Sequence, residues 1–208
     1  MWVKICGVSN VESAIVVADA GADALGLNFV GRSKRRISTE TAGAIADAVR
    51  GRLELVAVVE DWTVEEAARL RDQLKLDRVQ FHSARSVIDE STLPDWAYMA
   101  SGLSTPSDAS ALAIPTQRWI LVDACVGGIS GGTGSTFDWN WVKSVAVERP
   151  LILAGGLGVA NVVDAIATAQ PFGVDVASGV EPKNKPGIKD PDLVCEFVRR
   201  ARGGPDKA

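Results

Sequence analysis

The sequence predicts an α/β protein, a single (βα)8 TIM barrel with one eight-stranded parallel sheet, and three observations carry this prediction. Short runs rich in Val, Ile and Leu recur along the 208 residues, turn residues follow the runs, and alanine-rich stretches with helical spacing separate most of them. Because the runs do not alternate between apolar and polar residues, their strands are expected to be buried on both faces, as in parallel sheets. A doubly wound open sheet is the alternative fold.

Each apolar run is expected to form one strand. The strands are predicted over residues 2–8, 24–30, 54–61, 78–82, 96–101, 118–124, 151–156 and 173–179. Apolar residues at helical spacing predict helices over 11–22, 39–51, 63–74, 161–169 and 191–201. Residues that favour helix N-caps stand at the start of several of them: Asn10, Ser38, Thr63 and Asn161. Eight strands alternating with helices over about 200 residues indicate a barrel near its lower size limit.

The segment 84–117 fits this pattern least well. Ser and Pro are frequent there, so its helix is expected to be short or irregular. No stretch has the composition of a linker. Residues 1–202 are therefore predicted to form one barrel domain, and residues 203–208 a loose tail.

The composition limits the kinds of partner and the cellular compartment that we expect for this protein. The chain has 22 basic and 26 acidic residues, a net charge of −4, and no basic stripe, which disfavours a nucleic-acid partner. Its apolar runs are far shorter than the ~20 residues of a membrane helix, and its start does not resemble a signal peptide. The three cysteines are widely separated, so a disulfide framework is not expected. We expect no membrane partner and a cytoplasmic location.

Two small-residue loops predict a phosphate site. The carboxyl ends of barrel strands form the active face, because the βα loops converge there. Gly155 and Gly156 end the seventh predicted strand, and Ser178 and Gly179 end the eighth. Glycines let the backbone approach an anion, and barrels often bind phosphate at these two loops. The pattern favours a phosphorylated small molecule as ligand; glycines needed only for turn geometry are the alternative.

Cys6 and Asp123 are candidates for acid–base chemistry, since each lies near the carboxyl end of a predicted strand. A free cysteine is usually a buried structural residue. Lys4, however, would point to the same side of its strand, and a thiol with an ordinary pKa of about 8.5 needs only a modest depression to act as a base. Asp123 follows a mostly apolar run, so it is either a loop-capping acceptor or a functional carboxyl group with a raised pKa.

Three further features are ambiguous. His82 is the only histidine, which excludes a histidine pair for a metal, and a hydrogen-bonded structural role is favoured for it. The basic loop 31–36 is either a solvated surface or an anion-binding segment. The glycine-rich segment 127–139 is either a flexible connection or a loop that closes over a ligand.

Five motifs in order resemble one known family. They are KICGV, VQFH, LVDA followed by GGTGSTFDW, LAGGL with NVVDAI, and GVDVASGVE with a later KD, and they run from residue 3 to about residue 197. Any one of them is weak evidence, but the ordered set resembles the phosphoribosylanthranilate isomerases. The resemblance implies a cofactor-free and metal-free Amadori rearrangement in tryptophan biosynthesis, which converts N-(5′-phosphoribosyl)anthranilate to 1-(2-carboxyphenylamino)-1-deoxyribulose 5-phosphate.

The resemblance also implies roles for individual residues. Cys6 corresponds to the general base and Asp123 to the general acid, while Arg35 corresponds to the arginine that contacts the anthranilate carboxylate. The glycines after the seventh strand and the small residues after the eighth correspond to the phosphate site. The other positions that we expect to bind substrate are Lys4, His82, Gly131, Gly132 and Asp175.

The sequence departs from the family pattern at Lys34, Ser83 and Ala177, and none of these is expected to touch the predicted acid or base. Two alternative functions remain open. One is another phosphosugar isomerase or epimerase on the same barrel, because many reactions share this fold. The other is a phosphate-ligand-binding protein that has lost catalysis. Either a monomer or a homodimer is expected.

Overall fold

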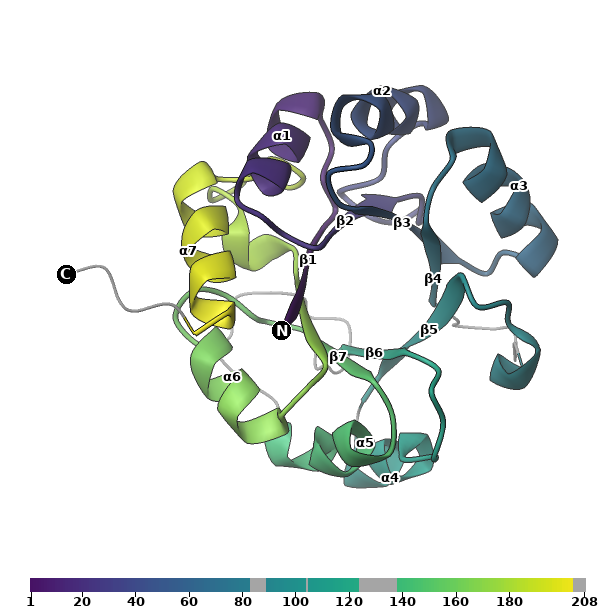
Figure 1. The fold of residues 1–208 in the computed structure, drawn as a ribbon, viewed down its shortest axis with the longest axis vertical. Helices are drawn as coiled ribbons and strands as arrows, with labels where there is room; N and C mark the ends of the chain where they lie inside the picture. The colour runs from purple at the N-terminus through teal and green to yellow at the C-terminus, as the bar shows by residue number, and fades with distance from the viewer. Residues whose placement is uncertain (83–88, 104, 124–137, 204–208) are drawn as a thin grey trace.

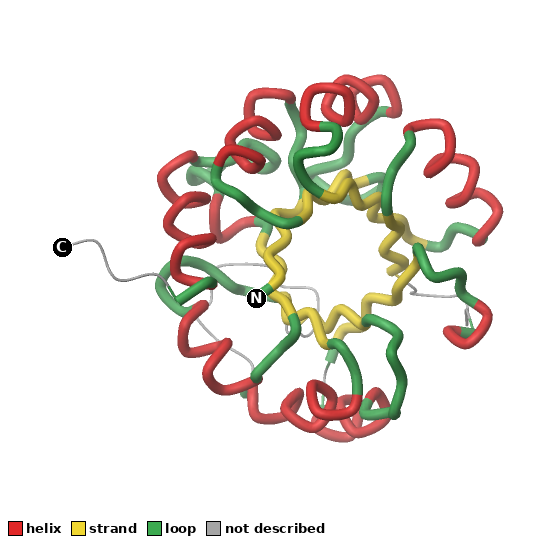
Figure 2. Tube along the Cα trace, viewed as in Figure 1, coloured by secondary structure: helices red, strands yellow, loops and turns green. Residues whose placement is uncertain are grey.

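The computed structural model describes residues 1–82, 89–103, 105–123 and 138–203, and it forms a closed barrel of parallel strands (Figures 1 and 2). The strands follow one another around the ring in chain order, and β8 closes it by pairing with β1. They are β1 (Trp2–Cys6), β2 (Ala24–Asn28), β3 (Glu54–Glu60), β4 (Arg78–His82), β5 (Ala97–Gly102), β6 (Ile120–Asp123), β7 (Leu151–Ala154) and β8 (Gly173–Val176). The predicted barrel is confirmed, and the closure excludes the open-sheet alternative.

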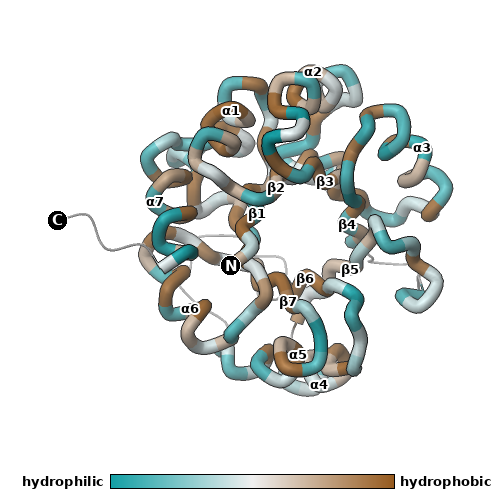
Figure 3. Tube along the Cα trace, viewed as in Figure 1, coloured by the Kyte–Doolittle hydropathy of each residue, from teal (hydrophilic) through white to brown (hydrophobic). Residues whose placement is uncertain are grey.

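The helices form an outer ring around the strands (Figure 2). The α-helices are α1 (Val11–Asp19), α2 (Thr39–Val49), α3 (Val64–Leu74), α4 (Pro106–Leu112), α5 (Lys143–Glu148), α6 (Val162–Ala169) and α7 (Pro191–Ala201). Short 3₁₀ helices are η1 (Glu90–Thr92), η3 (Trp139–Val142) and η4 (Ser178–Val180). Hydrophobic and hydrophilic residues alternate along the helices (Figure 3), as expected when one face of each packs on the barrel. In the described part of the chain, no helix is long and apolar enough to cross a bilayer.

All four predicted residues occupy the N-cap positions of their helices, but only three of them cap the helix with the side chain. The side chains of Asn10, Ser38 and Thr63 each accept a hydrogen bond from the first turn of the following helix. Asn161 makes no such bond. Its side chain instead accepts from Gly158 N and donates to Gly156 O, because the turn before α6 offers it these closer partners. Asn161 therefore braces the glycine turn after β7.

The last predicted strand is too long. It was expected to reach residue 179, but β8 ends at Val176, and the chain turns into η4. Valines alternate with Gly173 and Asp175 in the buried strand, whereas the small residues Ser178 and Gly179 favour a tight turn. Ser178 and Gly179 thus lie in a 3₁₀ turn beyond the strand. The segment 84–117 is irregular where it is described, with η1 before β5 and only the short α4 after it.

The barrel interior contains an apolar cluster and two buried charges. The cluster consists of aliphatic and aromatic side chains, namely Ala24, Val56, Tyr98, Ala100, Leu121, Ile152 and Ala154. Two charged residues, Lys4 and Asp175, are buried on the neighbouring strands β1 and β8. A charged group is rarely placed in a core without a partner or a function. A reaction site is therefore expected near these two charges.

Candidate active site

Cys6 ends β1 and lies at the carboxyl end of the barrel, where it is only 8% exposed. Its neighbour across the strand pair is Gly26 of β2. A Cβ atom at Gly26 would lie 2.8 Å from Cys6 Sγ and 3.2 Å from Lys4 Cε, so only glycine leaves room for both side chains. Gly26 was not among the predicted site residues, although a glycine within an aliphatic strand is a recognisable sign of close approach.

Lys4 and Asp175 form a buried ion pair between neighbouring strands. They face each other in the β1–β8 register, and Lys4 Nζ lies 3.0 Å from Asp175 Oδ1. Burial is the largest single influence on Lys4 and opposes its charge, but Asp175, Cys6 and Tyr98 together outweigh burial and raise the pKa of the ammonium. Among the described residues, neither of these two atoms has a hydrogen bond of good geometry. Buried polar atoms of this kind are rare in cores and are available to a polar ligand.

The surroundings of Cys6 act on its pKa in opposite directions. Burial raises the pKa of the thiol above its ordinary value, and this effect prevails. The positive charges of Lys4 and Lys189 oppose it by favouring the thiolate. The expected help from Lys4 is therefore present, but the pKa of the thiol is raised and not lowered as expected, because a nearly dry site disfavours any charge.

His82 ends β4 and belongs to a hydrogen-bonded chain inside the barrel. Tyr98 Oη donates to Gln80 Oε1 at 3.1 Å, which turns the amide nitrogen of Gln80 towards His82 Nε2 at 2.7 Å. In this arrangement the amide donates, so Nε2 accepts and the ring proton is assigned to Nδ1. Burial, with Lys4 and Arg32 nearby, lowers the pKa of His82 to about 4. The predicted hydrogen bonding is confirmed, and the imidazole is neutral at neutral pH.

Asp123 ends β6 on the same rim of the barrel as Cys6. It is half-buried and stands in register with Gly102 of β5 and Ala154 of β7. Two strands, β7 and β8, separate β6 from β1 around the ring, so a ligand at the mouth of the barrel has Cys6 and Asp123 on different sides. A raised pKa of Asp123 stays a prediction.

The structure brings the two predicted phosphate loops into contact. Gly155 and Gly156, directly after β7, have φ angles of 88° and 65°, which side chains disfavour. At Gly179 a Cβ atom would lie 2.0 Å from the carbonyl oxygen of Leu157, so the η4 turn fits against the β7 loop only with glycine there. Both loops lie at the carboxyl ends of adjacent strands, where a phosphate group can be shared between them.

Arg35, in the loop after β2, is held by Glu181, for which no role was predicted. Its Nε and Nη2 donate to the two carboxylate oxygens of Glu181 at 2.7 and 2.6 Å. Lys189 Nζ donates to the same carboxylate at 2.8 Å and to Ala177 O at 3.0 Å. Glu181 and Lys189 belong to the GVDVASGVE and KD motifs, and their position after the last strand was the available signal. Gly131 and Gly132 lie outside the described residues.

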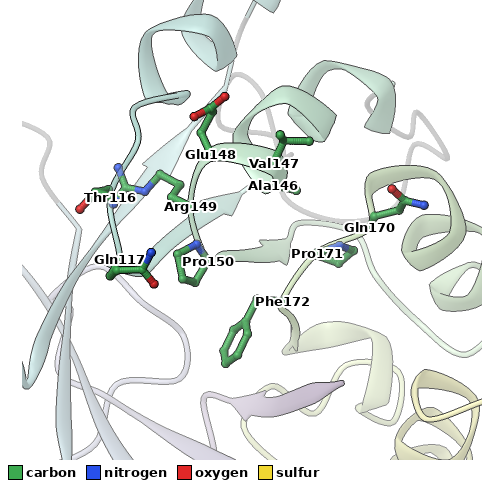
Figure 4. Close-up of a pocket in the computed structure, with 10 residues that line it drawn as sticks. All are labelled: Thr116, Gln117, Ala146, Val147, Glu148, Arg149, Pro150, Gln170, Pro171 and Phe172. Atoms are coloured by element: carbon green, nitrogen blue, oxygen red, sulfur yellow. The ribbon is translucent and has the colours of Figure 1, made fainter.

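A surface pocket of about 360 Å³ lies away from this site (Figure 4). Its walls come from the segments that lead into β6, β7 and β8, and they include Gln117, Arg149 and Phe172. It therefore opens at the amino ends of the strands, whereas βα loops place reactive groups at the carboxyl ends. We do not assign the active site to this pocket.

Comparison with known proteins gives consistent matches over the whole chain. The family model of N-(5′-phosphoribosyl)anthranilate (PRA) isomerase matches residues 3–200. The chain is 38% identical over 201 residues to the N-(5′-phosphoribosyl)anthranilate isomerase of Azotobacter vinelandii, and the match covers 96% of each protein. The crystal structure of phosphoribosyl anthranilate isomerase from Thermotoga maritima matches with a TM-score of 0.86 at 33% identity, over 98% of this chain and 99% of that one.

A further match is a phosphoribosyl anthranilate isomerase solved in complex with reduced 1-(o-carboxyphenylamino)-1-deoxyribulose 5-phosphate. Its TM-score is 0.81 at 33% identity, and the match covers 98% of this chain and 99% of that one. The similarity thus includes a protein with a phosphorylated, carboxylate-bearing ligand bound.

Proposed function

Because the chain belongs to the N-(5′-phosphoribosyl)anthranilate isomerase family, we propose that Cys6 is the base and Asp123 the acid of that isomerisation. The observation that carries this assignment is the position of both residues on one rim of the barrel, with Cys6 beside two buried ammonium groups. The product is the corresponding 1-deoxyribulose 5-phosphate, so the enzyme is an aldose–ketose isomerase of tryptophan biosynthesis.

Asp123 acts first in the proposed mechanism. Its carboxyl group gives a proton to the ribose ring oxygen while the bond between that oxygen and C1′ breaks. The nitrogen lone pair forms a double bond to C1′, which leaves a cationic Schiff base. General acid catalysis of this kind contributes typically 10²–10⁴-fold. A half-buried position at a strand end suits a carboxyl group that must be protonated part of the time.

Cys6 acts second, on the proton at C2′. The new positive charge on the Schiff base lies next to C2′, and a nearby cation favours the thiolate over the thiol. This offsets the effect of burial, which raises the pKa of Cys6. The thiolate takes the C2′ proton, the electrons of that bond form the enolamine, and the enolamine tautomerises to the ketone.

The remaining site residues bind the substrate in this proposal. Phosphate lies between the glycine turn at Gly155 and Gly156 and the η4 turn at Ser178 and Gly179, where two glycine-dependent backbones meet. Arg35 binds the anthranilate carboxylate. Three polar groups in the barrel mouth bind the sugar portion, namely Lys4, Asp175 and the neutral His82. Gly131 and Gly132, which follow β6 in the chain and lie outside the described residues, stay proposed as substrate-binding residues.

Turnover of freshly made N-(5′-phosphoribosyl)anthranilate, followed by its loss of fluorescence, tests the assignment. Cys6→Ala and Asp123→Asn are each expected to lower kcat by 10²–10⁴-fold. Cys195→Ala is the matched control, because Cys195 is an exposed free cysteine on α7. Undiminished turnover in either active-site variant removes that residue from its role. Wild-type protein that binds the reduced product analogue without turnover would instead support the binding-protein alternative.

Three broader properties are part of the same proposal. Residues 1–202 form one domain, the protein works in the cytoplasm, and it is a monomer or a homodimer. The molar mass from light scattering, measured as the protein elutes from a size-exclusion column, distinguishes the monomer from the homodimer.

A further inference from the structure

We propose that Glu181 is a positioning residue for substrate binding, because its carboxylate fixes the plane of the Arg35 guanidinium so that one edge of it faces the ligand. The inference rests on the proposed role of Arg35 as the contact for the substrate carboxylate. It gives a function to a residue that lies outside the acid–base pair.

The geometry of its guanidinium allows Arg35 to bind two carboxylates at once. Arginine presents five N–H donors in a rigid planar fork, with a side edge made by Nε and Nη2 and an end edge made by Nη1 and Nη2. Glu181 takes the side edge of Arg35 with two hydrogen bonds of 2.7 and 2.6 Å. The Nη1 atom makes no hydrogen bond to any of the described residues. A second carboxylate can therefore bind the end edge without displacing the first.

Glu181 is itself held in place. Its Oε1 also accepts hydrogen bonds from Lys189 Nζ at 2.8 Å and from Gly187 N at 2.9 Å, and its side chain is only 5% exposed. Burial would raise the pKa of this carboxyl group, but the bonds and charges of Arg35 and Lys189 prevail and lower it. The carboxylate is thus charged and fixed at neutral pH, and it transmits that rigidity to Arg35.

The same contacts join three loops of the active face. Lys189 N donates to Ser13 Oγ at 3.0 Å, and Ser9 N donates to Gly187 O at 3.0 Å, so the segment after η4 packs on the start of α1. A Cβ atom at Gly7 would lie 2.3 Å from Arg35 Cδ, so the stem of Arg35 rests directly on the loop after β1. Glu181 accordingly connects the loops after β1, β2 and β8.

The test compares KM with kcat in Glu181→Gln, Arg35→Ala and the double variant. Glutamine keeps the shape of Glu181 but turns a donating amide towards an arginine that needs acceptors. We expect Glu181→Gln to raise KM at least tenfold while kcat changes less than threefold. The double variant is expected to have the KM of Arg35→Ala alone, because both changes remove the same contact. A merely structural role would lower thermal stability and leave KM unchanged.

Two further variants keep the result interpretable. Glu54→Gln is the matched control, since Glu54 pairs with Arg78 at 3.1 Å at the amino ends of the strands and is expected to leave KM unchanged. Glu181→Asp keeps the charge, so it is expected to recover part of the loss, and it replaces the glutamine variant if that protein does not fold.

The outcomes separate this inference from the proposed function. If Arg35→Ala raises KM but neither Glu181→Gln nor Glu181→Asp does, the positioning role is wrong and the role of Arg35 stands. Additive effects in the double variant also overturn the positioning role. An unchanged KM in Arg35→Ala overturns the role of Arg35 and this inference with it, while turnover itself continues to test Cys6 and Asp123.

Discussion

The two ends of the barrel are built from opposite kinds of residue. At the carboxyl end, charged side chains are buried close together: Lys4, Asp175, Glu181 and Lys189. At the amino end, Trp119 packs against Trp2, Phe172 and Tyr98 at ring-centroid distances of 5.3, 5.0 and 6.0 Å. The guanidinium of Arg78 covers the ring of Trp119 at 4.0 Å.

This contrast indicates that binding and catalysis depend mainly on the carboxyl end of the barrel, and stability mainly on the amino end. Buried ion pairs contribute little net stability, because the cost of removing two charges from water offsets their attraction. Aromatic clusters contribute through buried area and through favourable ring geometry. We therefore expect changes at the carboxyl end to affect turnover most and changes at the amino end to affect unfolding most.

The largest effect is expected for Lys4→Met, which leaves the carboxylate of Asp175 buried without its partner. Such a change costs about 3–5 kcal/mol of unfolding free energy. The double variant Lys4→Met/Asp175→Val is expected to regain most of that stability and to stay inactive. Urea unfolding and turnover measure both properties. If the double variant stays as unstable as the single one, the ion pair stabilises the barrel and the contrast between the two ends is wrong.

The variant Trp119→Ala tests how much the aromatic cluster at the amino end contributes to stability. It removes a half-buried ring with three aromatic neighbours and a cation above it, so we expect a loss of about 3 kcal/mol of unfolding free energy. Turnover per folded molecule is expected to stay within twofold of wild type. Thermal unfolding and turnover below the transition check this, and a tenfold loss of turnover would connect the amino end to the reaction.

Gly26→Ala changes the carboxyl end by one methyl group. The new Cβ atom would lie 2.8 Å from Cys6 Sγ and 3.0 Å from Cys6 Cα, so the thiol must move. We expect about 1–3 kcal/mol of destabilisation from overpacking and more than a tenfold loss of kcat. Gly43→Ala is the matched control, since in α2 its Cβ atom meets only Leu74 Cδ2 at 3.8 Å. That variant is expected to gain about 0.5–1 kcal/mol of unfolding free energy from helix propensity.

The smallest effect concerns pH. The folded protein lowers the pKa of His82 from 6.5 to about 4, so the unfolded chain binds more protons between these values. Stability is then fully present above pH 6.5 and is lost as the pH falls towards 4. Between pH 7 and pH 5.5 the loss is expected to be about 1 kcal/mol. Urea unfolding of wild type and His82→Gln over this pH range checks the prediction. It is contradicted if the free energy of unfolding falls equally steeply with pH in the two proteins.

Local sequence accounts for most of the fold. The apolar runs placed every strand in the chain, and the short helix after β5 agrees with its Ser- and Pro-rich segment. Helix α5 was not predicted, because it is short and follows a 3₁₀ turn that hides its spacing. The predicted ends of the strands were less accurate than their predicted positions, as at β8. Burial on both faces is visible in the sequence, but the point where a turn begins is not.

What the sequence determined about this protein is the barrel and the presence of Cys6 and Asp123 at strand ends, since both depend on residues close together in the chain. What only the tertiary structure decided is the surroundings of those groups. Arg35 and Glu181 lie 146 residues apart, and they meet because closure of the barrel places the loops after β2 and β8 around the same strand. The pKa of Cys6 depends likewise on burial and on two lysines from opposite ends of the chain. Such long-range contacts are set by closure of the sheet, which no local pattern contains.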